Sequence, residues 1–166
     1  MNALVPMRGG INIAPHASRK LSIAPSTPQA IDKVNRLTTA MREQLPAVPF
    51  VTEHLLHAGM YLRTVRMPAN TLIAAVLFKR ATALIIEGSA DVWSNDEVIP
   101  VDGYSVIPCA AGRKIALITR SDLKATMVFP SSATTVAEAE KEFTDEYDQL
   151  PPLSRASEHV ITITGV

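Results

Sequence analysis

Histidines are the residues of this chain best suited to chemistry, and two of the four lie close together in the sequence. His54 and His57 follow Glu53 in the order E-H-x-x-H, whereas His16 and His159 are remote from them. On a helix, the two neighbouring imidazoles would share one face and could hold a metal ion. The metalloprotease order is H-E-x-x-H, however, and no third ligand is placed near this pair. We therefore expect a surface pair or a pair at the entry to a strand.

Nucleophilic and redox chemistry would depend on one residue, because the chain holds a single cysteine. Cys109 excludes an internal disulfide and any zinc site built from several cysteines. It follows Pro108 in a predicted turn, and the sequence places no histidine beside it to activate the thiol. We expect Cys109 to be a small buried residue.

Basic side chains could bind an anion at one end of the predicted strands. The candidates are Arg63, Arg66, Lys79 and Arg80. Basic residues on strand faces are more often simply solvated, which is the competing interpretation. Trp93 fits a core or interface position as well as it fits a platform for a ligand.

The stretch from Met60 to Pro130 must position any such site, and its pattern predicts short strands. Apolar runs of strand length are separated by turn residues about every 8–10 positions. Asp102-Gly103 has the composition of a hairpin turn. The pattern indicates a small antiparallel sandwich or barrel.

Two helices are predicted, one on each side of these strands. The first spans residues 27–46, with Thr27 as its N-cap and apolar residues at helical spacing. It could pack on its own barrel or between protomers. The second spans residues 134–150 and begins with a capping-box pattern of Thr135 and Glu138. Its acidic residues suit a solvated face or docking against the basic half of another copy.

Extensions flank a domain predicted over residues 55–130. Residues 1–26 form an arm punctuated by Pro, Ser and Gly, which we expect to be mobile unless another surface holds it. Residues 151–166 form a tail, and its last stretch alternates like a strand. That strand could pair with its own sheet or add to the sheet of another chain. The length is that of one domain with extensions.

Composition supports a folded domain and argues against several classes. A hydrophobic fraction of 47% is ample for a core. No apolar run reaches the ~18–20 residues of a membrane helix, and the N-terminus lacks the pattern of a secretion signal. Residues 1–80 hold ten basic and three acidic residues, whereas residues 81–166 hold six and thirteen. Halves of opposite charge favour self-association over nucleic-acid binding, unless folding mixes the charges.

Two segments resemble the paired motifs of the cupin superfamily, G-x5-H-x-H-x3,4-E-x6-G and G-x5-P-x-G-x2-H-x3-N. The stretch "ATALIIEGSADVW" is similar to the end of the first, with Gly88 in the place of its last glycine. Gly103, Pro108 and Gly112 match the glycine–proline–glycine frame of the second, at a different spacing. The stretches "HAGMYLRTVRMPANTLIAAV" and "VIPCAAGRKIALI" also resemble small cupins encoded by tailed bacteriophages. The resemblance implies a mainly β fold, a cupin-type antiparallel jelly-roll barrel.

The metal ligands that this resemblance implies are replaced by apolar residues. Counted from the motif glycines, the positions of the family's glutamate and three histidines are Ala75, Leu77, Ala81 and Ile115. None of these side chains can ligate a metal. We therefore predict no metal, no cofactor and no catalytic residue, and we expect that the protein is not an enzyme.

The favoured function is a structural protein that assembles with copies of itself, as a dimer or trimer, and docks on other subunits. Its concrete form is a bacteriophage virion protein, such as a capsid cement or decoration protein, made in the bacterial cytoplasm and then carried in the virion. The alternative is a metal-free cupin that binds or isomerises a small anionic metabolite in the barrel mouth, held by Arg63, Lys79 or Arg113. No nucleic-acid or membrane partner is expected.

Overall fold

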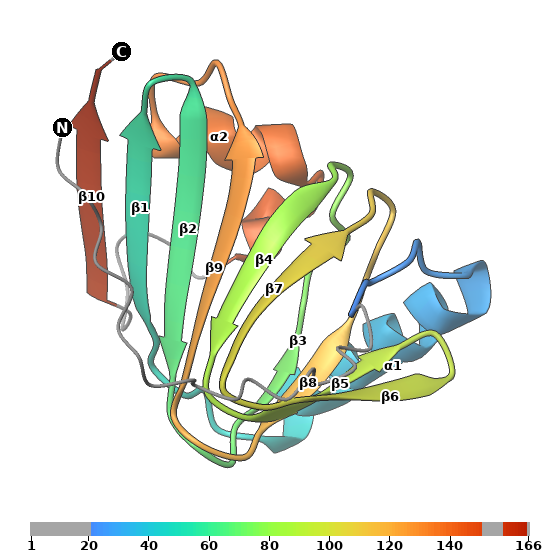
Figure 1. Cartoon of the computed structure of the whole chain (residues 1–166). Coiled ribbons are helices and arrows are strands. Elements are labelled where there is room, and N and C mark those ends of the chain that lie inside the picture. The colour runs from blue at the N-terminus through green and yellow to red at the C-terminus, as the bar shows by residue number, and fades with distance from the viewer. Residues whose placement is uncertain (1–20, 151–157, 166) are drawn as a thin grey trace, which may run out of the picture.

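The computed structural model describes residues 21–150 and 158–165, and its main feature is a pair of β-sheets that face one another (Figure 1). The six-stranded sheet holds, in spatial order, β10 (Glu158–Thr164), β1 (Val51–His57), β2 (Met60–Met67), β9 (Leu123–Pro130), β4 (Thr82–Glu87) and β7 (Tyr104–Cys109). The four-stranded sheet holds β3 (Leu72–Ala74), β8 (Ala116–Thr119), β5 (Ala90–Ser94) and β6 (Glu97–Val101). The mainly β, jelly-roll architecture predicted from the sequence is confirmed, with the strands arranged as two sheets rather than as one closed barrel.

The strand pairings are antiparallel except at one edge, where β1 and β10 run parallel. The terminal strand predicted in the tail therefore pairs with its own sheet. The expected hairpin at Asp102-Gly103 is wrong, because β6 pairs with β5 and β7 pairs with β4. This turn instead carries the chain from the smaller sheet to the larger one. The first strand begins at Val51, ahead of the predicted start of the barrel at residue 55.

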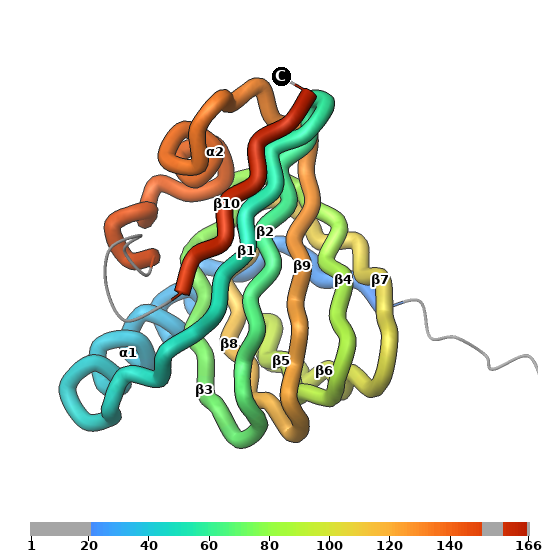
Figure 2. The backbone as a smooth tube through the Cα atoms, turned by 90° about the vertical axis from the view of Figure 1, so that its left-hand side faces the viewer, coloured from blue at the N-terminus to red at the C-terminus, as the bar shows by residue number. Residues whose placement is uncertain are grey.

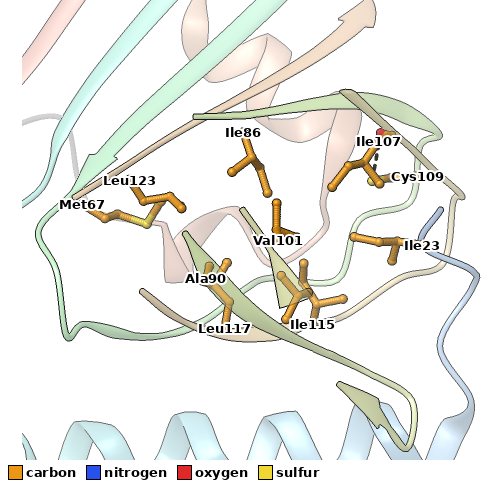
Figure 3. Close-up of a cluster of buried hydrophobic side chains, with 11 residues drawn as sticks. Ile23, Met67, Ile86, Ala90, Val101, Ile107, Cys109, Ile115, Leu117 and Leu123 are labelled. Carbon is orange, nitrogen blue, oxygen red and sulfur yellow. Dashed lines mark hydrogen bonds between the residues drawn. The ribbon is translucent and has the colours of Figure 1, made fainter. Parts of the chain in front are cut away.

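A hydrophobic core fills the space between the two sheets. Figure 3 shows its side chains converging from both sheets, including Ile86 and Ile107 from the larger sheet and Ala90 from the smaller one. Each of these three is at most 1% exposed. Ile23 also enters this core, and its backbone pairs with Cys109 beside β7. The last residues of the predicted arm are therefore part of the packed domain, whereas residues 1–20 lie outside the described part.

Gly88 occupies a position where the fold requires glycine. Its φ is +124°, which side chains rarely adopt. A Cβ built there would lie 2.5 Å from the backbone oxygen of Asp122. The turn between β4 and β5 thus brings two backbone segments together, which explains the motif glycine without any ligand.

The first helix, α1 (Pro28–Gln44), packs on its own domain. Thr27 caps it as predicted, because the Thr27 hydroxyl accepts a hydrogen bond from the Ala30 N–H at 3.2 Å. Ala30 and Val34 are its buried residues, and the helix contacts β3 (Figure 2). Leu37 and Met41, farther along the same apolar stripe, are partly buried, so the stripe is covered most completely near its N-terminal end.

The second helix, α2 (Val136–Phe143), is shorter than the predicted span of 134–150. The capping box of Thr135 and Glu138 is present as expected. The chain leaves the helix at Thr144, which is extended, and forms a single turn, η1 (Tyr147–Gln149). This early end lets Glu146 turn inward to Lys114. Local helix propensity is overridden here by a tertiary contact.

A second core lies where α2 covers the inner face of the larger sheet. Phe143 is fully buried and contacts the rings of Tyr61, Phe78 and Phe129. Ala139 and Phe143 are both 0% exposed. This packing fixes α2 above the side chains of β1 and β2.

Folding mixes the charges of the two halves of the sequence. Lys33 pairs with Asp96 at 2.6 Å, and Arg80 pairs with Glu142 at 3.6 Å. Lys79 pairs with Asp145. These pairs join the basic half to the acidic half within one chain, so the charge asymmetry of the sequence need not be neutralised by another copy. No helix in the described ranges is long and apolar enough to cross a membrane.

Candidate functional site

The E-H-x-x-H segment lies on strand β1, which separates its members. Successive side chains of a strand point to opposite faces. His54 is 2% exposed and points inward, whereas His57 and Glu53 point outward, with Glu53 accepting a hydrogen bond from Arg66 Nε at 2.7 Å. The three residues cannot converge on one ion, and the segment instead contributes a single buried histidine.

His54 belongs to a chain of three polar rings. Its Nδ1 lies 2.7 Å from the hydroxyl of Tyr61, and its Nε2 lies 3.1 Å from Nδ1 of His159. The His54 and His159 rings are stacked, with centroids 5.4 Å apart. With both imidazoles neutral, Tyr61 can donate to His54, and His54 can donate to His159. The contact ties the last strand of the sheet to the interior.

The electrostatic surroundings keep this chain of rings neutral. Burial, aided by the nearby Arg63 and His159, lowers the pKa of His54 to about 4. Burial also raises the pKa of the Tyr61 hydroxyl well above its usual value. At neutral pH, therefore, an uncharged imidazole lies beside an un-ionised phenol.

Arg63 lies on the same inner face as these rings, and its guanidinium has no partner among the described residues. We call His54, Tyr61, Arg63, Glu140 and His159 the polar cluster. It lies opposite His54 in the β1–β2 register and opposite Met127 in the β2–β9 register, so it shares the inner face with them. Its Nε is buried without a hydrogen bond, while the side chain as a whole keeps some accessible surface. Burial lowers the pKa of the Arg63 guanidinium.

Glu140 of α2 is the acidic residue whose charge acts on Arg63. None of the ion pairs between described residues joins the two side chains. Burial is the main cause that raises the pKa of the Glu140 carboxyl, and the charge of Arg63 opposes it. The two groups thus interact electrostatically across more than the 4.0 Å of an ion pair. A guanidinium in this position can donate hydrogen bonds to a carboxylate or phosphate from outside the protein.

The other basic candidates have partners within the protein. Arg113 is 2% exposed, donates to the carbonyls of Arg80 and Ala110 and to the Thr82 hydroxyl, and lies over the ring of Phe78. Of the three residues that the sequence offered as ligands for an anion, Arg113 is therefore structural. Lys79 is paired with Asp145 near the surface. Of these candidates, Arg63 is the one for which no acceptor is found in the described part of the chain.

The four positions that a metal-binding cupin would use differ in how deeply they are buried. Ile115 is in the core and is 4% exposed, and its carbonyl accepts a hydrogen bond from the Ala75 N–H at 2.9 Å. Leu77 is partly buried, and Ala81 is exposed. Within residues 21–150 and 158–165, no group of three or more His, Cys, Asp and Glu side chains is placed to hold a metal ion.

Cys109 and Trp93 take the roles of packing residues. Cys109 is 3% exposed on the inner face of β7, and burial raises the pKa of its thiol. Trp93 is 39% exposed and borders a hollow of about 280 Å³ between α1 and the smaller sheet, together with Leu37 and Leu72. Neither residue contacts the polar cluster through a hydrogen bond.

Sequence patterns missed two members of the cluster, Tyr61 and Glu140. A usable signal was present on β2, where Tyr61 and Arg63 share one face with the apolar Val65 and Met67. A charged residue on an apolar strand face is a candidate site by itself. Glu140 gave no such signal, because it is one of many acidic residues in its helix.

Comparisons with known proteins give matches only among solved structures. Neither a protein family model nor a curated protein matches the chain. A cupin superfamily protein from Desulfitobacterium hafniense is 13% identical, with a TM-score of 0.44, over 53% of this chain and 84% of that one. Ectoine synthase from P. lautus is 23% identical, with a TM-score of 0.44, over 59% and 75%. Salicylate 1,2-dioxygenase from Pseudaminobacter salicylatoxidans is 12% identical, with a TM-score of 0.47, over 81% and 42%.

These matches correct one expectation and agree with another. The expectation that the protein is not an enzyme is wrong as an exclusion, because ectoine synthase and salicylate 1,2-dioxygenase are enzymes with similar strand arrangements. The apolar residues at the metal positions argue against one chemistry only. The two facing sheets agree with the jelly-roll architecture that the sequence resemblance implied, and the solved structures that the chain resembles include cupin superfamily proteins.

Proposed function

We propose that Arg63, on the inner face of the larger sheet, binds a small organic carboxylate. The observation that carries this proposal is the guanidinium of Arg63, whose Nε is buried and for which the described residues offer no acceptor. Buried charges are normally paired, because an unpaired charge loses its hydration without compensation. A ligand carboxylate would supply the missing acceptor.

The surroundings of Arg63 favour a singly charged ligand with an apolar body. One guanidinium balances one negative charge, and the neighbouring Glu140 would oppose a second one. Met127 and Leu84 continue the same inner row as Arg63 and offer apolar contacts. A monocarboxylate therefore suits the site better than a phosphate dianion, which needs several donors.

Neutral His54 and Tyr61 give this site a fixed polar wall. At neutral pH the imidazole is unprotonated and the phenol is un-ionised, and their 2.7 Å hydrogen bond joins them to each other, so neither is suited to exchange a proton with a bound carboxylate. Both side chains are held in place, His54 by its two ring contacts and Tyr61 by the Phe129 and Phe143 rings. The proposal therefore covers binding of the ligand and assigns no proton transfer to these two residues.

Arg63→Met should abolish carboxylate binding. We expect wild-type protein to melt at a higher temperature in the presence of a fitting aliphatic or aromatic monocarboxylate, because a ligand that binds only the native state stabilises it. Without the guanidinium, the same compounds should leave the melting temperature unchanged. The measurement is thermal unfolding against a panel of monocarboxylates, with inorganic phosphate for comparison, followed by calorimetric titration of the best compound.

The matched control is Arg66→Met, three positions along the same strand. Arg66 points to the opposite face and pairs with Glu53, so its loss should leave binding intact. The proposal fails if no compound of the panel stabilises the wild-type protein, or if the Arg63 variant binds as well as the Arg66 variant.

Self-assembly is the second candidate function, and the exposed apolar residues support it. Tyr104 and Val106 on β7 are 70% and 55% exposed, and Val160 on β10 is 46% exposed. These strands form the two edges of the larger sheet. Apolar residues gathered at sheet edges are typical of surfaces that meet another protein.

A role as a virion component, such as a capsid cement protein, stays a proposal within this second function. Its test is to separate particles from the native source on a density gradient. Sedimentation of the chain in a fixed ratio to a shell protein would support the proposal, and recovery with soluble protein alone would contradict it.

A further inference from the structure

We infer that the free edge of β10 binds β10 of a second copy, which joins the two larger sheets into one continuous antiparallel sheet. This inference rests on the second proposed function, self-assembly, and names its surface. Strand β10 is the outermost strand of its sheet in Figure 1, and no described strand pairs with its other side. On that side, the backbone groups of residues 160–164 pair with no described strand, and they can pair with another strand.

The other edges of the two sheets are protected against pairing. Strand β7 contains Pro108 and is flanked by Ile23, whose N–H donates to the Pro108 carbonyl at 3.0 Å. Strand β6 contains Glu97 and Pro100. Strand β3 is only three residues long. Short strands, prolines, charges and covering segments are the means by which proteins keep sheet edges from associating.

Among the described residues, no segment covers the outer edge of β10, and the strand lacks the other protections over most of its length. From His159 to Thr164 it has no proline and no acidic, lysine or arginine side chain. Val160 on one face is 46% exposed, and Ile161 and Ile163 on the other are 47% and 43% exposed. A seven-residue edge with exposed β-branched residues on both faces is suited to main-chain pairing.

A second copy is the partner that best fits this edge. A two-fold axis at Ile161 makes the pairing antiparallel and places the two Ile161 side chains side by side. In that register, Val160 lies opposite Thr162, and Glu158 lies opposite Thr164. No like charges face each other, and the formal net charge of the chain is zero, so two copies do not repel one another overall.

Ile161→Lys tests the inferred surface, because it places two ammonium groups beside each other at the two-fold axis. We expect the wild-type protein to sediment as a dimer and this variant as a monomer, its association weakened about tenfold or more. Val160→Lys, on the other face of the strand, should have the same effect and serves if Ile161→Lys lowers the melting temperature. The measurement is sedimentation equilibrium of the full chain.

Two control variants distinguish this edge from other surfaces. Val98→Lys changes a residue that is 52% exposed on the protected strand β6, and Val106→Lys changes one that is 55% exposed on β7. Both variants should remain dimeric. The inferred surface would be overturned if both β10 variants stayed dimeric while Val106→Lys, or removal of residues 1–20, caused dissociation. Self-assembly itself would still stand in that case. A monomeric wild-type protein would overturn the surface and self-assembly together.

Discussion

Replacing Glu146 with alanine should lower the free energy of unfolding by about 3–5 kcal/mol, because it leaves a buried ammonium group unpaired. Lys114 is 1% exposed, and its Nζ donates to both carboxylate oxygens of Glu146 at 2.7 Å. The Leu77 N–H donates to the same carboxylate at 2.8 Å. One substitution therefore removes the acceptor of several donors. Urea unfolding followed by circular dichroism measures the loss.

The neighbouring residue offers a matched control for this change. Asp145 pairs with Lys79, but its side chain is 86% exposed, so Asp145→Ala should change stability by less than about 1 kcal/mol. The double variant Lys114→Met/Glu146→Leu should recover most of the loss, because it removes both charges and keeps the volume. Equal effects of Glu146→Ala and Asp145→Ala would show that the buried pair contributes no more than the exposed one.

Acidification from pH 7 to pH 4 should destabilise the protein by about 3 kcal/mol through His54 alone, since each pKa unit corresponds to about 1.4 kcal/mol. The folded-state pKa of His54 is lowered from 6.5 to about 4. The unfolded chain therefore takes up a proton on His54 below pH 6.5, while the folded protein resists it until about pH 4. The stability that this neutral histidine contributes is complete above pH 6.5 and is lost as the pH falls.

Other titratable and charged groups that face His54 change the pH range over which this stability is lost, each in a direction that can be stated. Arg63 and Tyr61 on β2 and His159 on β10 surround the imidazole, and Arg63 and His159 act against its protonation. The raised pKa of Glu140 works in the opposite sense, because its protonation at low pH removes a buried charge. We expect the His54 effect to exceed it between pH 6.5 and 5, above the usual range for carboxyl groups.

His54→Gln gives the direct test of the pH dependence. Glutamine can retain a hydrogen bond to Tyr61 but cannot titrate, so the fall in stability between pH 6.5 and 5 should become shallower. His57→Gln, on the exposed face of the same strand, should keep the wild-type slope. Urea unfolding at a series of pH values measures both. A wild-type slope in the His54 variant would assign the pH dependence to other groups.

Local chemistry in the sequence was sufficient to predict most of the fold. The N-cap at Thr27 and the capping box of Thr135 and Glu138 mark the starts of both helices, because these side chains bond to backbone groups a few residues away. Alternation in the last stretch likewise predicts β10. Each of these signals depends on neighbours in the sequence, which is why each could be recognised there.

Long-range choices were not predictable in the same way. Asp102-Gly103 suits a hairpin, yet whether its flanking strands pair depends on which sheet each one joins. The early end of α2 depends on Lys114, which is 32 positions from Glu146. The candidate site also depends on a long-range contact, because His159 reaches His54 and Tyr61 only when β10 docks beside β1. Arg63 could be named from the sequence, but the absence of an acceptor for it among residues 21–150 and 158–165 could not.

The parallel pairing of β1 with β10 also has a consequence for the rate of folding. His54 and His159, which meet across these strands, are 105 positions apart in the chain. Closing so long a loop is entropically unfavourable and generally slow, so this pairing should form after the hairpin of β1 with β2. Until then β1 is the open edge of the sheet. The order of folding therefore decides which strand a second chain would meet first, and a slow last step would favour exchange of β10 between chains.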